Sequence, residues 1–154
     1  MSIIKESLMP SSFPLNLVFA RDFALTLSGD LLLGSDGDLD TVIGEDVLLQ
    51  EIIVRLKTKK GDAKYAKEMG ASLDTLIGRA NSPVTQRDAE KLIMSALTHD
   101  GLFSEEDLVI IAYPVSETTI SLTISCNMSR YGGSISGDLL SIEVTLDLQE
   151  GLLL

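Results

Sequence analysis

The chain has 154 residues and a mass of 16.6 kDa, a size that suits one domain with a single core. Acidic residues outnumber basic ones by 23 to 12, so the net charge is −11 and the dense positive face of a general nucleic-acid binder is lacking. No apolar run reaches the ~20 residues that cross a bilayer, and the single cysteine cannot form an internal disulfide. We therefore expect an acidic domain of the cytoplasm that binds neither nucleic acid nor membranes.

The N-terminal part of the chain predicts an arm followed by a hairpin. Residues 1–20 mix prolines, serines and apolar residues without a sustained period, so we expect an N-terminal arm that another surface must order. From Phe23 to Leu27 the apolar residues alternate, and turn sequences follow at 28–30 (Ser-Gly-Asp) and 34–38 (Gly-Ser-Asp-Gly-Asp). This pattern predicts two short strands joined as a hairpin.

Two stretches have the spacing of amphipathic helices. The first opens at Gly44, has two acids in its first turn, carries apolar residues at 48, 49, 52, 53 and 56, and ends in lysines. Gly61 suits the position just beyond its end. The second has sharper boundaries, because Ser82 is a good N-cap and Pro83 suits the first helical position. Its apolar face falls at 89, 92, 93, 96 and 97.

After the second helix the apolar period changes to two. An apolar strand is expected over 108–112, ending before Pro114, and alternation predicts strands over 120–128 and 142–148. Residues 151–154 are interpreted as an apolar C-terminal tail. A hairpin, two main helices and then strands predict a single α+β domain over 21–150, with a small antiparallel or mixed sheet.

The charge of the chain is unevenly distributed. Nine of the twelve basic residues lie between Arg55 and Lys91 together with five acids, so this window carries +4 and the rest of the chain −15. A block of one sign within a chain of the other is typical of a surface that meets a complementary partner. A solvated helix end and loop explain the same charges equally well.

Three acids at alternate positions raise the question of a calcium site. Asp36, Asp38 and Asp40 match the start of an EF-hand loop, but Thr41 and Val47 stand where that loop needs Gly and Glu. Asp-Gly pairs are also common in hairpin turns, so the turn interpretation is favoured.

The other side chains that could take part in catalysis have simpler structural explanations. His99 falls at a helix end, where a cation complements the dipole, and Cys126 falls in the apolar phase of a strand. Carboxylate pairs for glycoside hydrolysis arise by chance among 23 acids, and seven aromatic residues without Trp give little lining for a sugar cleft. We therefore expect no enzyme activity, no metal and no cofactor. The acids that could form such pairs are Glu45, Asp46, Glu105 and Glu106.

Residues 23–78 carry a series of short motifs. The series reads Phe-Ala-Leu-Thr-Leu at 23–27, Asp-Gly-Asp-Leu at 36–39, then Gln50, Arg-Leu-Lys-Thr-Lys-Lys-Gly-Asp at 55–62, and Gly70. It resembles the baseplate wedge family of contractile-tailed phages and related injection machines, also called the baseplate assembly protein W or tail lysozyme-like family. In that family a helix bearing Gln ends in Leu-x-Thr-x-x-Gly-Glu, and a basic, proline-containing loop leads to a Gly.

The chain departs from the family pattern within that loop. Asp62 stands for the family's glutamate, Ala63 for its arginine and Lys67 for its proline. The loop geometry therefore need not follow the family, while Lys64 and Lys67 supply positive charge in place of the missing arginine.

The resemblance implies a fold similar to the C-terminal domain of tail sheath proteins. It also implies a structural component of the virion, an inner wedge protein of the tail baseplate that assembles in the host cytoplasm and templates the first sheath ring. Other wedge proteins and the tail sheath protein are the implied partners, with tail tube and hub proteins as further candidates. A peptidoglycan-cleaving tail lysozyme and a regulatory adaptor of the same fold are the alternatives.

Two sets of contact residues follow from the resemblance and the strand pattern. The strand over 142–148 is expected to pair with a sheath strand, because a long terminal strand at a sheet edge invites a partner; a central strand of the domain's own sheet is the alternative. The expected wedge contacts are Gln50, Arg55, Thr58, Lys59, Lys60, Gly61, Asp62, Lys64, Lys67 and Gly70. The expected strand-pairing residues are Ile142, Glu143, Val144, Thr145, Leu146, Asp147 and Leu148.

Overall fold

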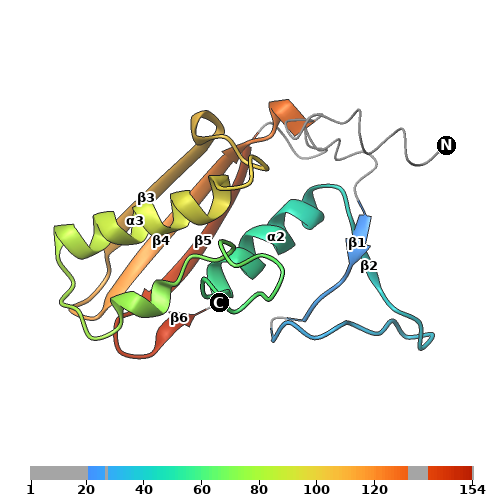
Figure 1. Cartoon of the computed structure of the whole chain (residues 1–154), viewed down its shortest axis with the longest axis horizontal. Helices are drawn as coiled ribbons and strands as arrows, with labels where there is room; N and C mark the ends of the chain where they lie inside the picture. Colours follow the sequence, from blue (N-terminus) through green and yellow to red (C-terminus); the bar gives the residue numbers. More distant parts are fainter. Residues whose placement is uncertain (1–20, 27, 132–138, 154) are drawn as a thin grey trace.

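A computed structural model describes residues 21–26, 28–131 and 139–153, which form two helices and two antiparallel sheets (Figure 1). Helices and strands occupy separate parts of the chain, so the predicted α+β fold is confirmed. The predicted N-terminal arm over 1–20 lies outside the described residues. In chain order the elements are β1 (Arg21–Phe23), β2 (Thr41–Ile43), helix α2 (Glu45–Lys57), the 3₁₀ turn η1 (Leu73–Leu76), helix α3 (Pro83–Thr98), the 3₁₀ turn η2 (Glu105–Asp107), β3 (Leu108–Pro114), β4 (Thr119–Asn127), the 3₁₀ turn η3 (Ser129–Tyr131), β5 (Leu139–Asp147) and β6 (Gly151–Leu153).

The C-terminal half is a four-stranded antiparallel meander in the order β3-β4-β5-β6. Leu122 on β4 lies opposite Ala112 on β3 and Val144 on β5, so the same phase of each strand faces the same side. That phase is buried or half-buried, whereas Val109 and Ile111 in the other phase of β3 are exposed. The alternation predicted for the last strands is confirmed.

Helices α2 and α3 cover the buried side of this sheet (Figure 1). Each buried Leu or Ile stabilises the packing of helices on sheet by roughly 1.5–3 kcal/mol. The N-terminus of α3 is as predicted, since Ser82 Oγ accepts a hydrogen bond from Thr85 N at 3.3 Å and Pro83 follows the cap. No helix in the described part of the chain is long and apolar enough to cross a bilayer. The helical core residues are Leu48, Ile52, Leu56, Ala89, Ile93, Ala96 and Leu97.

The residues before α2 form more than the predicted hairpin. β1 pairs with β2, and single bridges between Leu25 and Leu31 and between Leu33 and Leu39 close two smaller loops. Each of the two predicted turns closes one of these loops, while Leu27 lies outside the described residues. We call residues 21–43 the three-lobed segment.

The three lobes meet at a ring of backbone hydrogen bonds. The N–H of Leu32 donates to the carbonyl of Ala24, that of Ala24 to Asp40, and that of Asp40 to Leu32, with N···O distances of 2.8, 2.9 and 2.9 Å. This ring satisfies the backbone at the junction, so the segment holds its shape with little help from a core.

Two predicted boundaries are wrong. Helix α2 ends at Lys57 and Thr58 is extended, so Gly61 lies within the following loop rather than just beyond the helix. Residues 151–153 form β6 instead of a tail, and Leu152 packs on the core; Leu154 lies outside the described residues. The chain reverses there for two reasons. Asp147 Oδ1 accepts hydrogen bonds from the backbone N–H groups of Gln149 and Glu150, and Gly151 adopts a φ of 102°.

Candidate functional site

Residues 57–72, which we call the basic loop, leave the end of α2 and return to it. The N–H of Ala71 donates to the carbonyl of Arg55 at 2.9 Å. Gly70 permits this close return, since its φ is 116° and a Cβ added there would overlap the carbonyl oxygen of Thr58 and lie 2.7 Å from its carbonyl carbon. The base of the loop is therefore fixed against the helix.

Polar contacts tie the first half of the basic loop to η1. Lys59 Nζ lies 2.7 Å from Asp74 Oδ2, and the N–H of Lys60 donates to Ser72 Oγ at 2.8 Å. The hydrogen bond and the charge of Asp74 raise the pKa of Lys59 above its ordinary value. The side chain of Lys60 remains exposed.

The second half of the basic loop projects into solvent. The N–H of Gly61 donates to the carbonyl of Lys67 at 2.8 Å, which closes the projection at its neck. At its tip Tyr65 is 93% exposed, and Lys64 Nζ lies 5.4 Å from the centre of its ring. Asp62 is also exposed. The loop thus presents lysines around one aromatic side chain on a closed backbone frame.

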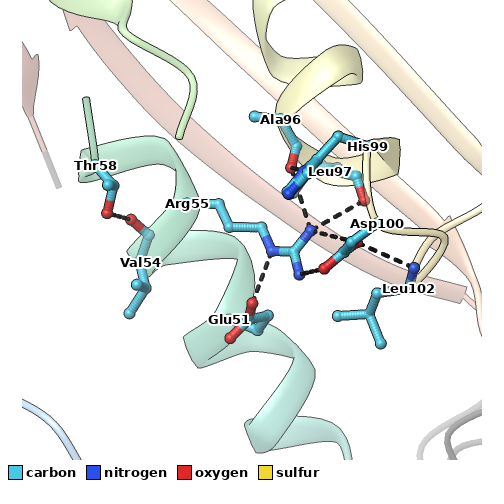
Figure 2. A network of polar contacts seen from close by, with 9 residues as sticks. All are labelled: Glu51, Val54, Arg55, Thr58, Ala96, Leu97, His99, Asp100 and Leu102. Atoms are coloured by element: carbon cyan, nitrogen blue, oxygen red, sulfur yellow. Dashed lines mark hydrogen bonds and ion pairs between the residues drawn. The ribbon is translucent and has the colours of Figure 1, made fainter. Parts of the chain in front are cut away.

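Arg55, predicted as a wedge contact, points into the protein (Figure 2). Its Nη2 lies 2.6 Å from Asp100 Oδ2 and its Nε 2.7 Å from Glu51 Oε1, while Nη1 donates to the carbonyls of Ala96 and Leu97 at 3.2 and 3.3 Å. The prediction of a surface contact is therefore wrong for this residue. Arg55 instead joins α2 to the C-terminal end of α3.

Electrostatic interactions keep both Arg55 and Asp100 charged. Burial acts to lower the pKa of Arg55, but hydrogen bonds from its guanidinium to Asp100 and Glu51, and their charges, raise the pKa overall. Burial acts to raise the pKa of Asp100, but the hydrogen bonds from Arg55 and from the N–H of Leu102 lower it overall. Both members of the pair are therefore ionised at neutral pH.

Two further predicted wedge contacts are engaged within the chain. Gln50 Oε1 accepts from the N–H of Leu25 and its Nε2 donates to the carbonyl of Phe23, both at 2.9 Å. The side chain thereby imitates a strand neighbour and holds the three-lobed segment against α2. Thr58 Oγ1 donates to the carbonyl of Val54 at 2.6 Å and caps the last turn of the helix.

The predicted sheath-pairing strand lies inside the sheet for part of its length. β4 pairs with all of β5, and β6 pairs with Thr145, Leu146 and Asp147. The carbonyl of Leu148 accepts from the N–H of Gly78 at 2.7 Å. The prediction of an open edge along the whole of 142–148 is wrong for its second half. Among the described residues, no strand pairs with Leu139–Val144 on the side away from β4.

The opposite edge of the sheet is protected over Ala112–Pro114. Backbone N–H groups alternate sides along an antiparallel strand, and Val115 donates toward β4, so the N–H of Ala112 points outward. Glu90 Oε1 on α3 accepts it at 2.8 Å. Pro114, the next outward position, has no N–H to offer. Such features prevent strand addition at an edge.

Two grooves border these elements. One, of about 410 Å³, lies between the basic loop, η1 and β6, and the other, of about 210 Å³, lies between the three-lobed segment and α2. The first is lined in part by Lys59, Ser72, Asp74, Ile77 and Leu152. The second is lined in part by Leu25, Val42, Leu49, Ile53 and Val54.

A second carboxylate with polar neighbours is Glu143, on the exposed face of the sheet. The hydroxyls of Ser121 and Tyr113 both donate to its Oε1, and these bonds lower the pKa of Glu143. A general acid for glycoside hydrolysis needs a raised pKa instead. This cluster therefore suits a fixed surface charge rather than proton donation.

The remaining reactive candidates sit in unreactive settings. Burial, with the charge of Asp107, raises the pKa of Cys126 to about 11, so its thiol stays protonated. His99 caps the end of α3, with Nδ1 3.0 Å from the carbonyl of Ala96. Across residues 21–26, 28–131 and 139–153, no group of three His, Cys, Asp or Glu side chains is placed to hold a metal ion.

Sequence reasoning missed the inward role of Arg55 and the exposure of Tyr65. Arg55 lies seven positions after Leu48 and three after Ile52, which places it on the apolar face of α2, so helical periodicity alone could have found it. Nothing in the sequence marks Tyr65, because a single tyrosine fits a core as well as a surface. A scan against protein-family models found no matching family, and a search of the curated proteins found no match to this chain.

Proposed function

We propose that this protein is a structural component of a contractile phage tail baseplate. In this role it is an inner wedge protein that binds other wedge proteins through the basic loop and templates the first ring of tail sheath through the free half of the β5 edge. It performs no catalysis and needs no cofactor. The motifs at 23–78 resemble those of the baseplate wedge family, and two structural features support the assignment.

The observation that carries the proposal is the asymmetry between the two edges of the sheet. Glu90 and Pro114 block the β3 edge over Ala112–Pro114, whereas β6 covers the second half of β5 and no described strand covers the first half. A strand edge that no described strand pairs with is suited to strand addition by a partner, which gains backbone hydrogen bonds. A sheath strand added there would run in line with β6.

The basic loop supports the proposed binding of wedge proteins. Its lysines are exposed on a frame that is closed at the base and at the neck. A preorganised loop loses little conformational entropy on binding, and its positive charge favours an acidic partner surface. The predicted wedge contacts on the exposed part of the loop are Lys60, Lys64 and Lys67, while Lys59 is paired with Asp74 and Gly61, Asp62 and Gly70 shape the backbone.

The strand-addition step can be tested with one backbone substitution. Leu148 donates its N–H to Thr118, on the β4 side, so the N–H groups of odd-numbered β5 residues point to the free edge. Ser141→Pro removes one of these without taking a hydrogen bond from the β4 ladder. Ser141→Ala is the matched control, since it removes only the hydroxyl that contacts Ser125.

The readout is co-assembly with purified tail sheath and baseplate wedge proteins. We expect Ser141→Pro to lose sheath co-sedimentation and keep wedge binding, and Ser141→Ala to keep both. Replacing Lys60, Lys64 and Lys67 with Glu should abolish wedge binding with an unchanged circular dichroism spectrum. Normal assembly by both the proline and the glutamate variants, or clearing of purified cell walls by the wild-type protein, would overturn the proposal.

A further inference from the structure

Two surfaces of this chain carry opposite charge. The three-lobed segment has five acids and one base, a net charge of −4, and the basic loop has five lysines and two acids, a net charge of +3. The acids are Asp22, Asp30, Asp36, Asp38 and Asp40, and the lysines are Lys57, Lys59, Lys60, Lys64 and Lys67.

Each surface also exposes apolar groups. The three-lobed segment exposes six large apolar side chains, of which Leu33 is 63% exposed, and the basic loop exposes Tyr65 at its tip. Several large apolar side chains exposed within one short segment favour an interaction site there, and an exposed tyrosine on a fixed loop is a typical anchor. The six side chains are Phe23, Leu31, Leu32, Leu33, Leu39 and Ile43.

Both surfaces are fastened to the same helix (Figure 1). The three-lobed segment precedes α2 and is held by the two hydrogen bonds of Gln50. The basic loop follows α2 and is held by the bond from Ala71 to Arg55. Every copy of the protein therefore presents an acidic, apolar surface and a basic, aromatic surface in a set relation.

We infer that the basic loop of one copy docks on the three-lobed segment of a second copy. Tyr65 enters among the exposed leucines while the lysines around it meet the aspartates of the lobes. The contact joins two different surfaces, so each copy can make it twice, and the copies either close into a ring, of which a two-fold pair is the smallest, or extend as an open filament. It uses the same loop as the proposed function but does not require a baseplate.

A second copy is the occupant that the charges favour. A partner for the basic loop must be acidic and apolar at once, and the three-lobed segment has both properties. The chain as a whole carries −11, so two copies repel each other except where the basic loop faces the lobes. The test belongs near physiological ionic strength, where a Debye length of about 8 Å screens the net charges more than a close contact.

The contact can be broken from either side without touching the core. The loop variant is Lys64→Gln with Lys67→Gln. The lobe variant is Asp36→Asn with Asp38→Asn, where Asn keeps an acceptor for the turn hydrogen bonds that these side chains make. Arg87→Gln with Lys91→Gln removes the same charge from α3 and is the matched control for the loop variant.

Sedimentation velocity over a range of protein concentrations is the measurement. We expect the wild-type protein and the α3 control to self-associate, and the loop and lobe variants each to do so about tenfold more weakly. Tyr65→Ala should weaken association by about tenfold or more. An equimolar mixture of loop and lobe variants should recover binding but stop at a pair, because it contains one intact loop and one intact lobe per pair.

Three results would overturn the inference. These are a wild-type protein that stays monomeric up to its solubility limit, a mixture that associates no better than its components, and a control as weak as the loop variant. A monomer that still binds wedge proteins through the basic loop would reject the self-contact and leave the proposed function standing. Circular dichroism of each variant confirms that the fold is retained.

Discussion

The four-stranded sheet and the three-lobed segment use similar residues in opposite ways. On β4 the apolar residues alternate with Ser and Thr, and Ile120, Leu122 and Ile124 are fully buried. In the three-lobed segment Leu31, Leu32 and Leu33 are consecutive and all exposed. Among the described residues of 21–43 only Ala24 is buried.

The difference shows that apolar content does not decide burial by itself. A strand with alternating residues can put one whole face against a second layer, and α2 and α3 supply that layer. Three adjacent leucines point to both sides of the backbone, so no single layer can cover them. The sheet is held by its core, whereas the three-lobed segment is held by hydrogen bonds and Gln50.

The largest effect should come from truncating a core leucine. Leu122→Ala removes a fully buried side chain between the helices and the sheet, and the loss of burial plus a cavity should lower the free energy of unfolding by about 2–5 kcal/mol. Leu33→Ala, its counterpart on the three-lobed segment, should change it by less than about 0.5 kcal/mol. Urea denaturation measures both, and equal losses would break the contrast between the two regions.

The next effect concerns the close return of the basic loop. Gly70→Ala forces a methyl group onto the Thr58 carbonyl at a positive φ, so we expect a loss of about 2–4 kcal/mol. Gly61→Ala also carries a positive φ but meets nothing within 4 Å, and should cost about 1 kcal/mol. Similar losses at both glycines would mean that the backbone around Thr58 and Gly70 moves apart at little cost and that the close contact is not required.

A smaller effect is expected at the link between α2 and the three-lobed segment. Gln50→Ala removes two hydrogen bonds to the backbone of β1 and its neighbour, which should cost about 1–2 kcal/mol. Hydrogen exchange should speed up at Leu25 and leave β4 unchanged. Gln50→Glu keeps the acceptor for Leu25 but sets a carboxylate oxygen against the carbonyl of Phe23, so it should cost at least as much as Gln50→Ala. Faster exchange throughout β4 would show that the two regions unfold as one.

The smallest effect is a pH dependence of the free energy of unfolding, which arises from the Arg55–Asp100 pair between α2 and α3. The pKa of Asp100 is lower in the folded protein than its ordinary value of 3.8 because of its hydrogen bonds to Arg55 and Leu102. Its stabilising contribution is therefore present above about pH 4 and is lost as the pH falls through the folded pKa. Asp100→Asn should flatten the decline of stability in that acidic range. Asp36→Asn, which removes a charge from the three-lobed segment, controls for net charge.

The sequence alone determined most of the secondary structure of this protein. Ser82 and Pro83 fixed the start of α3, and the two-residue period fixed β4 and β5, because caps and periodicity are local properties of the chain. The α+β class followed from the order of these elements. The positive charge of residues 57–67 can likewise be read from the order of the residues along the chain.

Only the tertiary structure decided what those charges and strands do. Arg55 and Lys59 lie in one basic stretch, yet the first is buried against α3 and the second is exposed beside η1. The strand over 142–148 looked like an edge, yet β6 folds back over half of it. Burial depends on residues distant in sequence, such as Asp100 for Arg55, and the pairing of β5 depends on where the chain turns back, at Gly151 just beyond its end. Periodicity along the chain therefore predicts an element and its faces, while the elements that pack beside it decide which face meets solvent.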